Sequence, residues 1–227
     1  MIIVENVSLK YPDGTIGLDK INVEIRAGEI VFITGPSGSG KTSFLKLLIG
    51  MEYPTEGNLT VLGQAINPNQ ASNIRKLRKS LGPVFQDFRL LKGRTVLDNV
   101  FIGMRFLNFS KIEMRLEALN AIDRVGLSHK TLSLVDHLSF GECQRVAIAR
   151  AVARKPSLII ADEPTGNLDI DNSLNILDLF KSFRDDNTSV IITTHATHLI
   201  DNISDCRKIK INKGVLSVKE VSYESFV

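Results

Sequence analysis

The stretch "GPSGSGKT", residues 35–42, decides the fold of this chain. It matches the pattern G-x-x-x-x-G-K-[ST], and it lies between the apolar run "IVFIT" and the helix-like segment "SFLKLLIG". Glycines there let the backbone curl so that successive N–H groups point at phosphate oxygens, and the following helix adds its positive N-terminus. A Gly/Ser-rich turn without a ligand is the alternative, but the matching flanks count against it. The stretch therefore predicts a nucleotide-binding loop.

The residue types within this loop predict how a nucleoside triphosphate and Mg²⁺ would be held. Lys41 would neutralise the β- and γ-phosphates, and the Thr42 hydroxyl would face Mg²⁺. The candidate nucleotide-binding residues of this segment are Gly35, Pro36, Ser37, Gly38, Ser39, Gly40, Lys41, Thr42 and Ser43.

A second stretch, "SLIIADEP" at residues 157–164, carries two adjacent carboxylates at the end of an apolar run. The end of a parallel strand lies at the carboxyl edge of its sheet, where ligands bind. Asp162 fits an outer-shell contact to Mg²⁺, and Glu163 fits a base that orients or deprotonates an attacking water. Alone, "DEP" could be a polar turn, but paired with the phosphate loop it predicts nucleotide hydrolysis.

The remaining patterns predict an α/β fold of the P-loop type. "IIVENVSLKY" and "INVEI" indicate short antiparallel strands near the N-terminus. "IVFIT", "LIIA" and "VIITT" are apolar on both faces, which is typical of buried strands in a mostly parallel core sheet. Helical patterns fill roughly residues 95–154. We therefore expect a parallel core, an N-terminal antiparallel β subdomain and an inserted α-helical subdomain.

Two helix starts within that region are marked by capping boxes. Ser110 and Glu113 precede a helix whose apolar residues recur at spacings of three and four and which ends at Gly126. Ser139 and Glu142 form the same pattern within "LSFGECQR", residues 138–145. Helix initiation alone would explain Ser139 and Glu142.

Composition is that of a soluble globular protein. The chain has 227 residues, of which 43% are apolar and 23% charged, and a net charge of +3. No leader-like start or apolar run of membrane-spanning length is present. Two cysteines without a metal or disulfide pattern fit a reducing compartment, so we expect a cytoplasmic protein. The basic cluster "IRKLRKS" is interpreted as a solvated helix face, and no nucleic-acid partner is expected.

With these motifs in order, the chain resembles the ATP-binding cassette (ABC) ATPases over nearly its whole length. Tyr11 resembles the aromatic that stacks on adenine, and Gln86 in "VFQD" resembles the Q-loop glutamine. "GNLD", ending at Asp169, resembles the D-loop, which implies that Asp169 contacts the nucleotide. His195 in "TTHAT" resembles the switch histidine. "LSFGECQR" resembles the family signature. Each also has a structural alternative: a core tyrosine, a strand end, a turn or a structural histidine.

The resemblance implies an ATPase with ATP and Mg²⁺ as its cofactors, in which Glu163, His195 and Gln86 are catalytic and Gln86 also contacts the metal. Two cassettes of this family associate head to tail on binding ATP. Ser139 and Gly141 of one copy would then contact the γ-phosphate held by the other. The resemblance also implies one domain over residues 1–227, with the core and β subdomain at about 1–90 and 155–227 and the helical subdomain at about 91–154.

Three residues depart from the family pattern. Phe140 stands where the family usually has glycine, which tolerates positive φ and close backbone approach. We therefore expect a working site with weaker or slower dimer closure. Cys143 replaces a frequent glutamine, and Ala196 stands where relatives commonly have an acid.

Within the family, residues 84–100 and 161–169 are most similar to the cassettes of bacterial cell division. Cassettes of lipoprotein release and macrolide export are the nearest alternatives. The resemblance implies a four-helix integral membrane partner, bound near Gln86, and a peripheral position on the inner face of the membrane. The groove candidates, for which plain core is an equal alternative, are Phe88, Leu90, Leu91 and Phe101. A soluble assembly factor and a weakly hydrolysing ATP-binding scaffold are rival functions.

Overall fold

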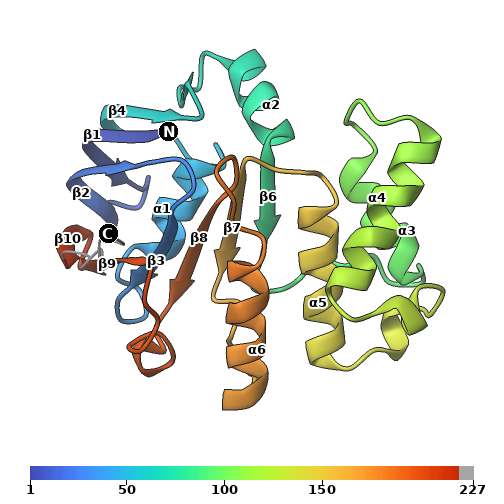
Figure 1. Cartoon of the computed structure of the whole chain (residues 1–227). Helices are drawn as coiled ribbons and strands as arrows, with labels where there is room; N and C mark the ends of the chain where they lie inside the picture. Colours follow the sequence, from blue (N-terminus) through green and yellow to red (C-terminus); the bar gives the residue numbers. More distant parts are fainter. Residues whose placement is uncertain (220–227) are drawn as a thin grey trace, which may run out of the picture. The chain divides into compact units, whose positions relative to one another are not determined.

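The computed structural model describes residues 1–219 and divides into two compact units by its internal contacts. Of the described residues, the first unit contains 1–78 and 184–219, and the second contains Lys79–Phe183. Each unit has its own strands and helices (Figure 1).

An antiparallel sheet occupies the N-terminal part of the first unit, with the strand order β2-β1-β4-β5. The strands are β1 (Ile2–Lys10), β2 (Ile16–Ile25), β4 (Glu56–Val61) and β5 (Gln64–Ala65). A tight turn joins β1 to β2, because the Tyr11 N–H donates to the Thr15 carbonyl and the Gly14 N–H to the Tyr11 carbonyl. The two predicted N-terminal strands are confirmed, and their alternation buries one face of the sheet.

The same unit holds the strand and helix that flank the phosphate loop. Strand β3 (Ile30–Thr34) is fully buried and pairs in parallel with both β8 (Ser189–Thr194) and β9 (Arg207–Asn212). β10 (Val215–Lys219) adds an antiparallel edge to β9. Three further elements complete the unit: α1 (Lys41–Leu48), α2 (Ala71–Lys79) and the short 3₁₀ turn η3 (Thr197–Leu199). The carboxyl ends of β3 and β8 therefore lie at one edge, where the loop and His195 follow.

The second unit combines a parallel strand pair with most of the helices. β6 (Leu81–Val84) pairs with β7 (Leu158–Asp162). Its helical elements are α3 (Val96–Met104), α4 (Lys111–Arg124), η1 (Ser128–Lys130), η2 (Val135–His137), α5 (Phe140–Val152) and α6 (Ile170–Lys181). Helices α3, α4 and α5 contact one another, and Figure 1 shows them gathered in green and yellow.

Both predicted capping boxes are present. The Ser110 side chain accepts from the Glu113 N–H and the Ser139 side chain from the Glu142 N–H, while each glutamate accepts from the backbone N–H of its serine. Gly126 follows α4 in the left-handed region, at φ +75°. The apolar stripe of α4 is only partly buried, however: Ile122 and Val125 lie in the core, whereas Ile112, Leu116 and Leu119 are exposed.

These observations confirm an α/β fold with an antiparallel β element, a mostly parallel core and a helical region. Helices α3, α4 and α5 all fall within residues 91–154, but the division into subdomains at those boundaries remains a prediction. Within residues 1–219, no helix is both long and apolar enough to span a bilayer.

Candidate functional site

The phosphate loop has a backbone that only glycine allows at two positions. Gly35 and Gly40 lie at φ +151° and +109°, and Gly38 at +73°. A Cβ at Gly35 would collide with the Ile211 carbonyl oxygen, and one at Gly40 with the carbonyl oxygen of Gly17. Positive φ and this close approach together explain why the loop needs glycine. The loop is thus a narrow turn packed against β2 and β9.

Two polar side chains of the loop are buried where phosphate would bind. Lys41 is buried, and its ammonium donates to the carbonyls of Gly35 (2.8 Å) and Pro36 (3.2 Å). Ser39 is buried too, and its hydroxyl has no hydrogen-bond partner among residues 1–219. A buried hydroxyl without a partner is costly, so a bound anion would satisfy it. The Lys41 ammonium and the unpaired Ser39 hydroxyl are groups that can both donate hydrogen bonds to a phosphate in this loop.

Tyr11 lies beside the first turn of the helix that follows the loop. Its hydroxyl is 3.0 Å from the Ser43 hydroxyl, and the Lys46 ammonium is 6.0 Å from its ring centroid. Gly17 makes this approach possible, because a Cβ there would lie 2.9 Å from the Tyr11 ring. The structure thus brings Tyr11 and the loop helix together. The sequence analysis missed Gly17, because its role depends on how the Tyr11 ring and the Ser43 side chain pack against it.

His195 and the start of the loop line one hollow of about 360 Å³. His195 is exposed and directly follows β8. Two lysines of β9, Lys208 and Lys210, line the same hollow and were missed by the sequence analysis. No local sequence pattern indicates Lys208 and Lys210, because only the parallel pairing of β3 with β9 brings them to the loop. Asp201 is the one acid in the lining, so the two lysines leave the hollow with a net positive charge beside the phosphate loop.

In the second unit, Asp162 and Glu163 lie at the carboxyl end of β7, as predicted, and both are half-buried. Glu163 adopts φ +47°, a left-handed conformation that is unfavourable for a residue with a Cβ. The turn is held because the Gly166 N–H donates to the Glu163 carbonyl at 3.0 Å. Strained residues of this kind cluster at functional sites.

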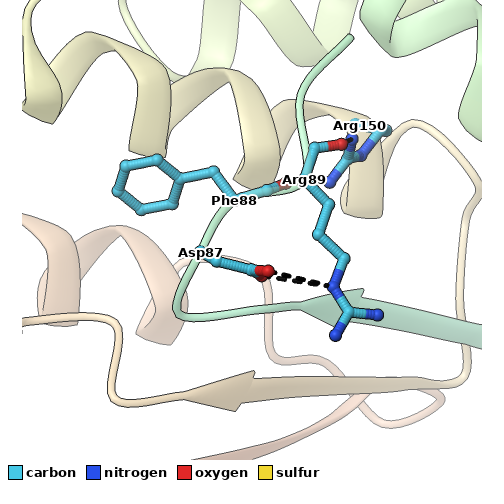
Figure 2. A network of polar contacts seen from close by, with 4 residues as sticks. All are labelled: Asp87, Phe88, Arg89 and Arg150. Atoms are coloured by element: carbon cyan, nitrogen blue, oxygen red, sulfur yellow. Dashed lines mark hydrogen bonds and ion pairs between the residues drawn. The ribbon is translucent and has the colours of Figure 1, made fainter.

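Gln86 is exposed and lies two residues beyond β6, at the start of a segment with unusual geometry. Phe88 and Arg89 both have left-handed φ angles, +55° and +50°. Figure 2 shows the Arg150 guanidinium directed at this segment from α5, where it donates to the carbonyls of Phe88 (2.5 Å) and Arg89 (2.7 Å). Asp87 pairs with Arg89 at 3.2 Å. Arg150 thus anchors the segment, and no local pattern marks it, because its partners are 61 and 62 positions away.

The signature segment begins α5 with an ordinary helical backbone. Phe140 is the first helical residue and is absent from the positive-φ positions, so a glycine's conformational freedom is not needed here. Its ring packs against Phe88, with 4.7 Å between centroids and an interplanar angle of 59°. A Cβ at Gly141 would meet only Leu168, at 3.9 Å. Ser139 and Gly141 are exposed and half-buried, respectively, so both remain accessible at the helix N-terminus.

Asp169 serves as the N-cap of α6. Its two carboxylate oxygens accept from the Asn172 backbone N–H (2.8 Å) and the Asn172 side-chain amide (2.7 Å). The backbone bond and then the side-chain bond lower the pKa of Asp169 below its usual range. A capping role accounts for the geometry of Asp169, and its role at a nucleotide remains a prediction.

Comparisons with known proteins agree with this geometry. The model of the family described as "ABC transporter" matches residues 18–166. The cell division ATP-binding protein FtsE of Mycobacterium tuberculosis (strain H37Rv) is 41% identical over 222 residues, covering 95% of this chain and 94% of that protein. FtsE of Escherichia coli (strain K12) is also 41% identical, over 216 residues, covering 95% and 97%.

A solved structure shows the same fold. The bacterial ABC transporter cassette MJ0796, whose structure is dimeric, superposes with a TM-score of 0.87 at 33% identity, covering 98% of this chain and all of that one. Another structure of that cassette is a dimer bound to ADP and Pi, with a TM-score of 0.86. Since the family model covers more than half of its residues, and relatives match it over nearly its full length, the chain belongs to the ABC transporter family.

Proposed function

We propose that this chain is the ATP-binding and ATP-hydrolysing subunit of a cell-division complex of the FtsE–FtsX type. It dimerises on ATP and transmits the conformational change through a membrane partner to control cell-wall hydrolysis at the septum. The observation that carries the ATPase activity is the phosphate loop, with its obligatory glycines and buried Lys41. Similarity to FtsE over the whole chain supports the cell-division role.

The loop residues bind the nucleotide through backbone N–H groups, while Lys41 holds the β- and γ-phosphates. Lys41 now donates to two loop carbonyls, so it is already directed into the loop. Tyr11, tied to Ser43 on the loop helix, would stack on the adenine. Glu163 would accept a proton from the attacking water, and His195 would stabilise the charge that develops on the γ-phosphate.

Each unit offers oxygen donors of the kind that binds Mg²⁺. Thr42 is exposed at the second residue of α1, and Gln86 and Asp162 supply further oxygens of the hard type that Mg²⁺ prefers. Within residues 1–219 no three His, Cys, Asp or Glu side chains form a preformed metal cluster, so phosphate and water oxygens would complete the coordination. When bound, the ion would neutralise charge on the phosphates.

The dimer would use the signature segment. Ser139 and Gly141 lie at the N-terminus of α5, a helix long enough to present positive potential to an anion. Nothing inside the unit requires glycine at position 141, since a Cβ there would make only ordinary contact with Leu168. An approach from outside, by the triphosphate on a second copy, would explain the glycine.

The membrane partner would dock as a helix in a groove of the second unit. A hollow of about 390 Å³ is lined by the apolar residues Leu91, Phe101, Ile102 and Met114 and by the charged residues Arg94, Asp98 and Arg105. A groove with both apolar and charged lining suits an amphipathic helix. Leu91 and Phe101 are two of the four predicted groove residues, whereas Phe88 packs against Phe140. The cassette would then lie on the inner face of the membrane.

Glu163→Gln tests the catalytic assignment. It should lower steady-state ATPase activity by about a hundredfold or more, because it removes the general base, while ATP binding persists. Glu56→Gln, the same chemical change at an exposed position of β4, is the matched control and should leave the rate unchanged. Equal activity of Glu163→Gln and wild type would contradict the assignment.

The trapped variant also tests the cell-division role. Glu163→Gln with ATP and Mg²⁺, mixed with native membranes solubilised in mild detergent, should capture a four-helix membrane protein, to be identified by mass spectrometry. Capture of an exporter or importer subunit instead would leave the ATPase assignment intact and overturn the division role. A purely soluble partner would favour an assembly factor.

A further inference from the structure

One side of the helical region exposes large apolar side chains that the fold does not use. Phe106, in the turn after α3, is 80% exposed, and Ile112 and Leu116 of α4 are 74% and 55% exposed. Leu119 continues the same stripe, because positions 112, 116 and 119 lie on one side of a helix. Helices α3 and α4 lie side by side in Figure 1 and contact each other. We call Phe106, Ile112, Leu116 and Leu119 the α4 patch.

The α4 patch does not contribute to the core of its unit. Helix α4 packs inward through another set of residues, Ala118, Ala121 and Ile122, and Val125 follows at its end. Large apolar side chains that gather on an exposed helix face, as Ile112, Leu116 and Leu119 do, are costly in water and mark an interaction site. The capping box starts α4 and the left-handed Gly126 ends it, so the exposed apolar residues of α4 are not needed to define the ends of the helix.

The charges around the α4 patch are mostly basic. Arg105, Lys111 and Arg115 are exposed, and none has a side-chain hydrogen bond or ion pair within the described residues 1–219. Of the two acids in the same stretch, Glu117 pairs with Lys155 at 2.7 Å, whereas Glu113 accepts from the Ser110 N–H at 2.8 Å and keeps its negative charge. The cations outnumber this one carboxylate, so the patch presents apolar side chains bordered by net positive charge.

We propose that the α4 patch binds an anionic lipid surface. Phe106, Ile112 and Leu116 enter the boundary between headgroups and acyl chains, while Lys111 and Arg115 contact lipid phosphates. Bulky apolar side chains flanked by Lys and Arg are the combination that holds amphipathic segments at membrane interfaces. Lipid binding would supplement the attachment supplied by a membrane partner, and it requires no protein in the membrane.

Helix α2 is basic like the α4 patch but lacks exposed large apolar side chains, so it separates the effect of charge on lipid binding from the effect of insertion. Arg75, Lys76 and Lys79 are exposed there, but the large apolar residues Ile74 and Leu77 are buried. Such a helix can attract an anionic surface electrostatically but has no side chain to insert. α2 is therefore a matched basic surface without an apolar patch.

The test is sedimentation of the purified full chain with lipid vesicles, without nucleotide. One set of vesicles is phosphatidylcholine, and in the other about a third of the lipid is phosphatidylglycerol. The chain should sediment with the anionic vesicles at low salt and much less with the neutral ones, and added salt should weaken binding. The paired variant Phe106→Ser and Ile112→Ser should lower the partition coefficient by about tenfold or more.

Charge variants separate the patch from general basicity. Lys111→Glu with Arg115→Glu should abolish the preference for anionic vesicles, whereas Arg75→Glu with Lys76→Glu on α2 should not, although the change in charge is the same. Circular dichroism and ATPase activity should match wild type for all variants. Because the vesicles contain no protein, this test is independent of the FtsX-type partner and of the ATPase assignment.

Three results would overturn the proposal. The first is no sedimentation of the wild-type chain with anionic vesicles at low salt. The second is equal loss of binding in the α2 and α4 charge variants. The third is capture of a membrane protein that depends on Phe106 and Ile112 without vesicle binding, which would assign the patch to that protein.

Discussion

Arg150→Met tests how α5 controls the segment that carries Gln86. The Arg150 guanidinium donates to the carbonyls of Phe88 and Arg89 (Figure 2), both of which have left-handed backbones. Burial, and then the charge of Arg89, lowers the pKa of Arg150 below its usual value, so the group carries a desolvation cost. Methionine keeps the apolar stem but removes both hydrogen bonds.

The magnitude follows from these terms. Two hydrogen bonds from a charged donor contribute about 1.5–3 kcal/mol each. Relief of the desolvation cost, together with release of about 1 kcal/mol or more of strain at each left-handed residue, offsets roughly half of that sum. We therefore expect the free energy of unfolding to fall by about 2 kcal/mol. Gln86 loses its position as the segment relaxes, so kcat should fall by about tenfold, which corresponds to about 1.4 kcal/mol.

Urea unfolding, amide hydrogen exchange and ATPase assays together measure these effects. Exchange should rise at residues 87–91 in Arg150→Met, and Arg150→Lys should fall between wild type and Met, because an ammonium cannot donate to both carbonyls in the geometry of the planar guanidinium. The matched control is Arg124→Met, which loses a surface hydrogen bond to the Ser182 carbonyl and a cation–π contact with Phe183, and should leave this segment protected. A stability loss below about 0.5 kcal/mol with unchanged exchange would refute the anchoring role.

Three further predictions concern the start of α5. Phe140→Gly, made in a Glu163→Gln background, should increase ATP-driven dimerisation in size-exclusion chromatography, and unchanged or lower dimerisation would show that the ring is accommodated. The hydrogen bond from the Ser139 N–H is the largest cause that lowers the pKa of Glu142. The ionised carboxylate therefore stabilises the fold above its unfolded pKa near 4.5. This stabilisation is lost as the pH falls through the lower pKa of the folded state. Glu142→Gln should thus be destabilising at pH 6 but not at pH about 3, and equal differences in urea unfolding at both would contradict this. Burial, then the charges of Glu142 and Asp136, raises the pKa of the Cys143 thiol. Iodoacetamide at pH 8 should therefore alkylate Cys143 more slowly than it alkylates the thiol of free glutathione, and equal rates would contradict a raised pKa.

The sequence predicted those parts of the candidate site that are formed by neighbouring residues. The phosphate loop between β3 and α1, the acids at the end of β7 and the capping box of α5 each depend on a few consecutive positions, so their patterns are visible in one chain. The prediction that Phe140 weakens or slows dimer closure stays a prediction; α5 starts at Phe140 with helical geometry, so close approach of a second copy, and not backbone strain, is the effect to test. The apolar periodicity predicted the stripe on α4, but it could not predict that other elements would bury only Ile122 and Val125 and leave the rest of the stripe exposed.

Local sequence patterns were enough to predict the elements, the phosphate loop and the family, because propensity, capping and glycine-dependent turns act over a few residues. Other features become visible only in the folded chain: the hydrogen bonds from Arg150 to Phe88 and Arg89, the place of Lys208 beside the loop, and the exposure of Phe106 and Ile112. These features depend on contacts, or on missing contacts, between residues far apart in the chain. No local pattern encodes such contacts, since they arise only once the elements have packed.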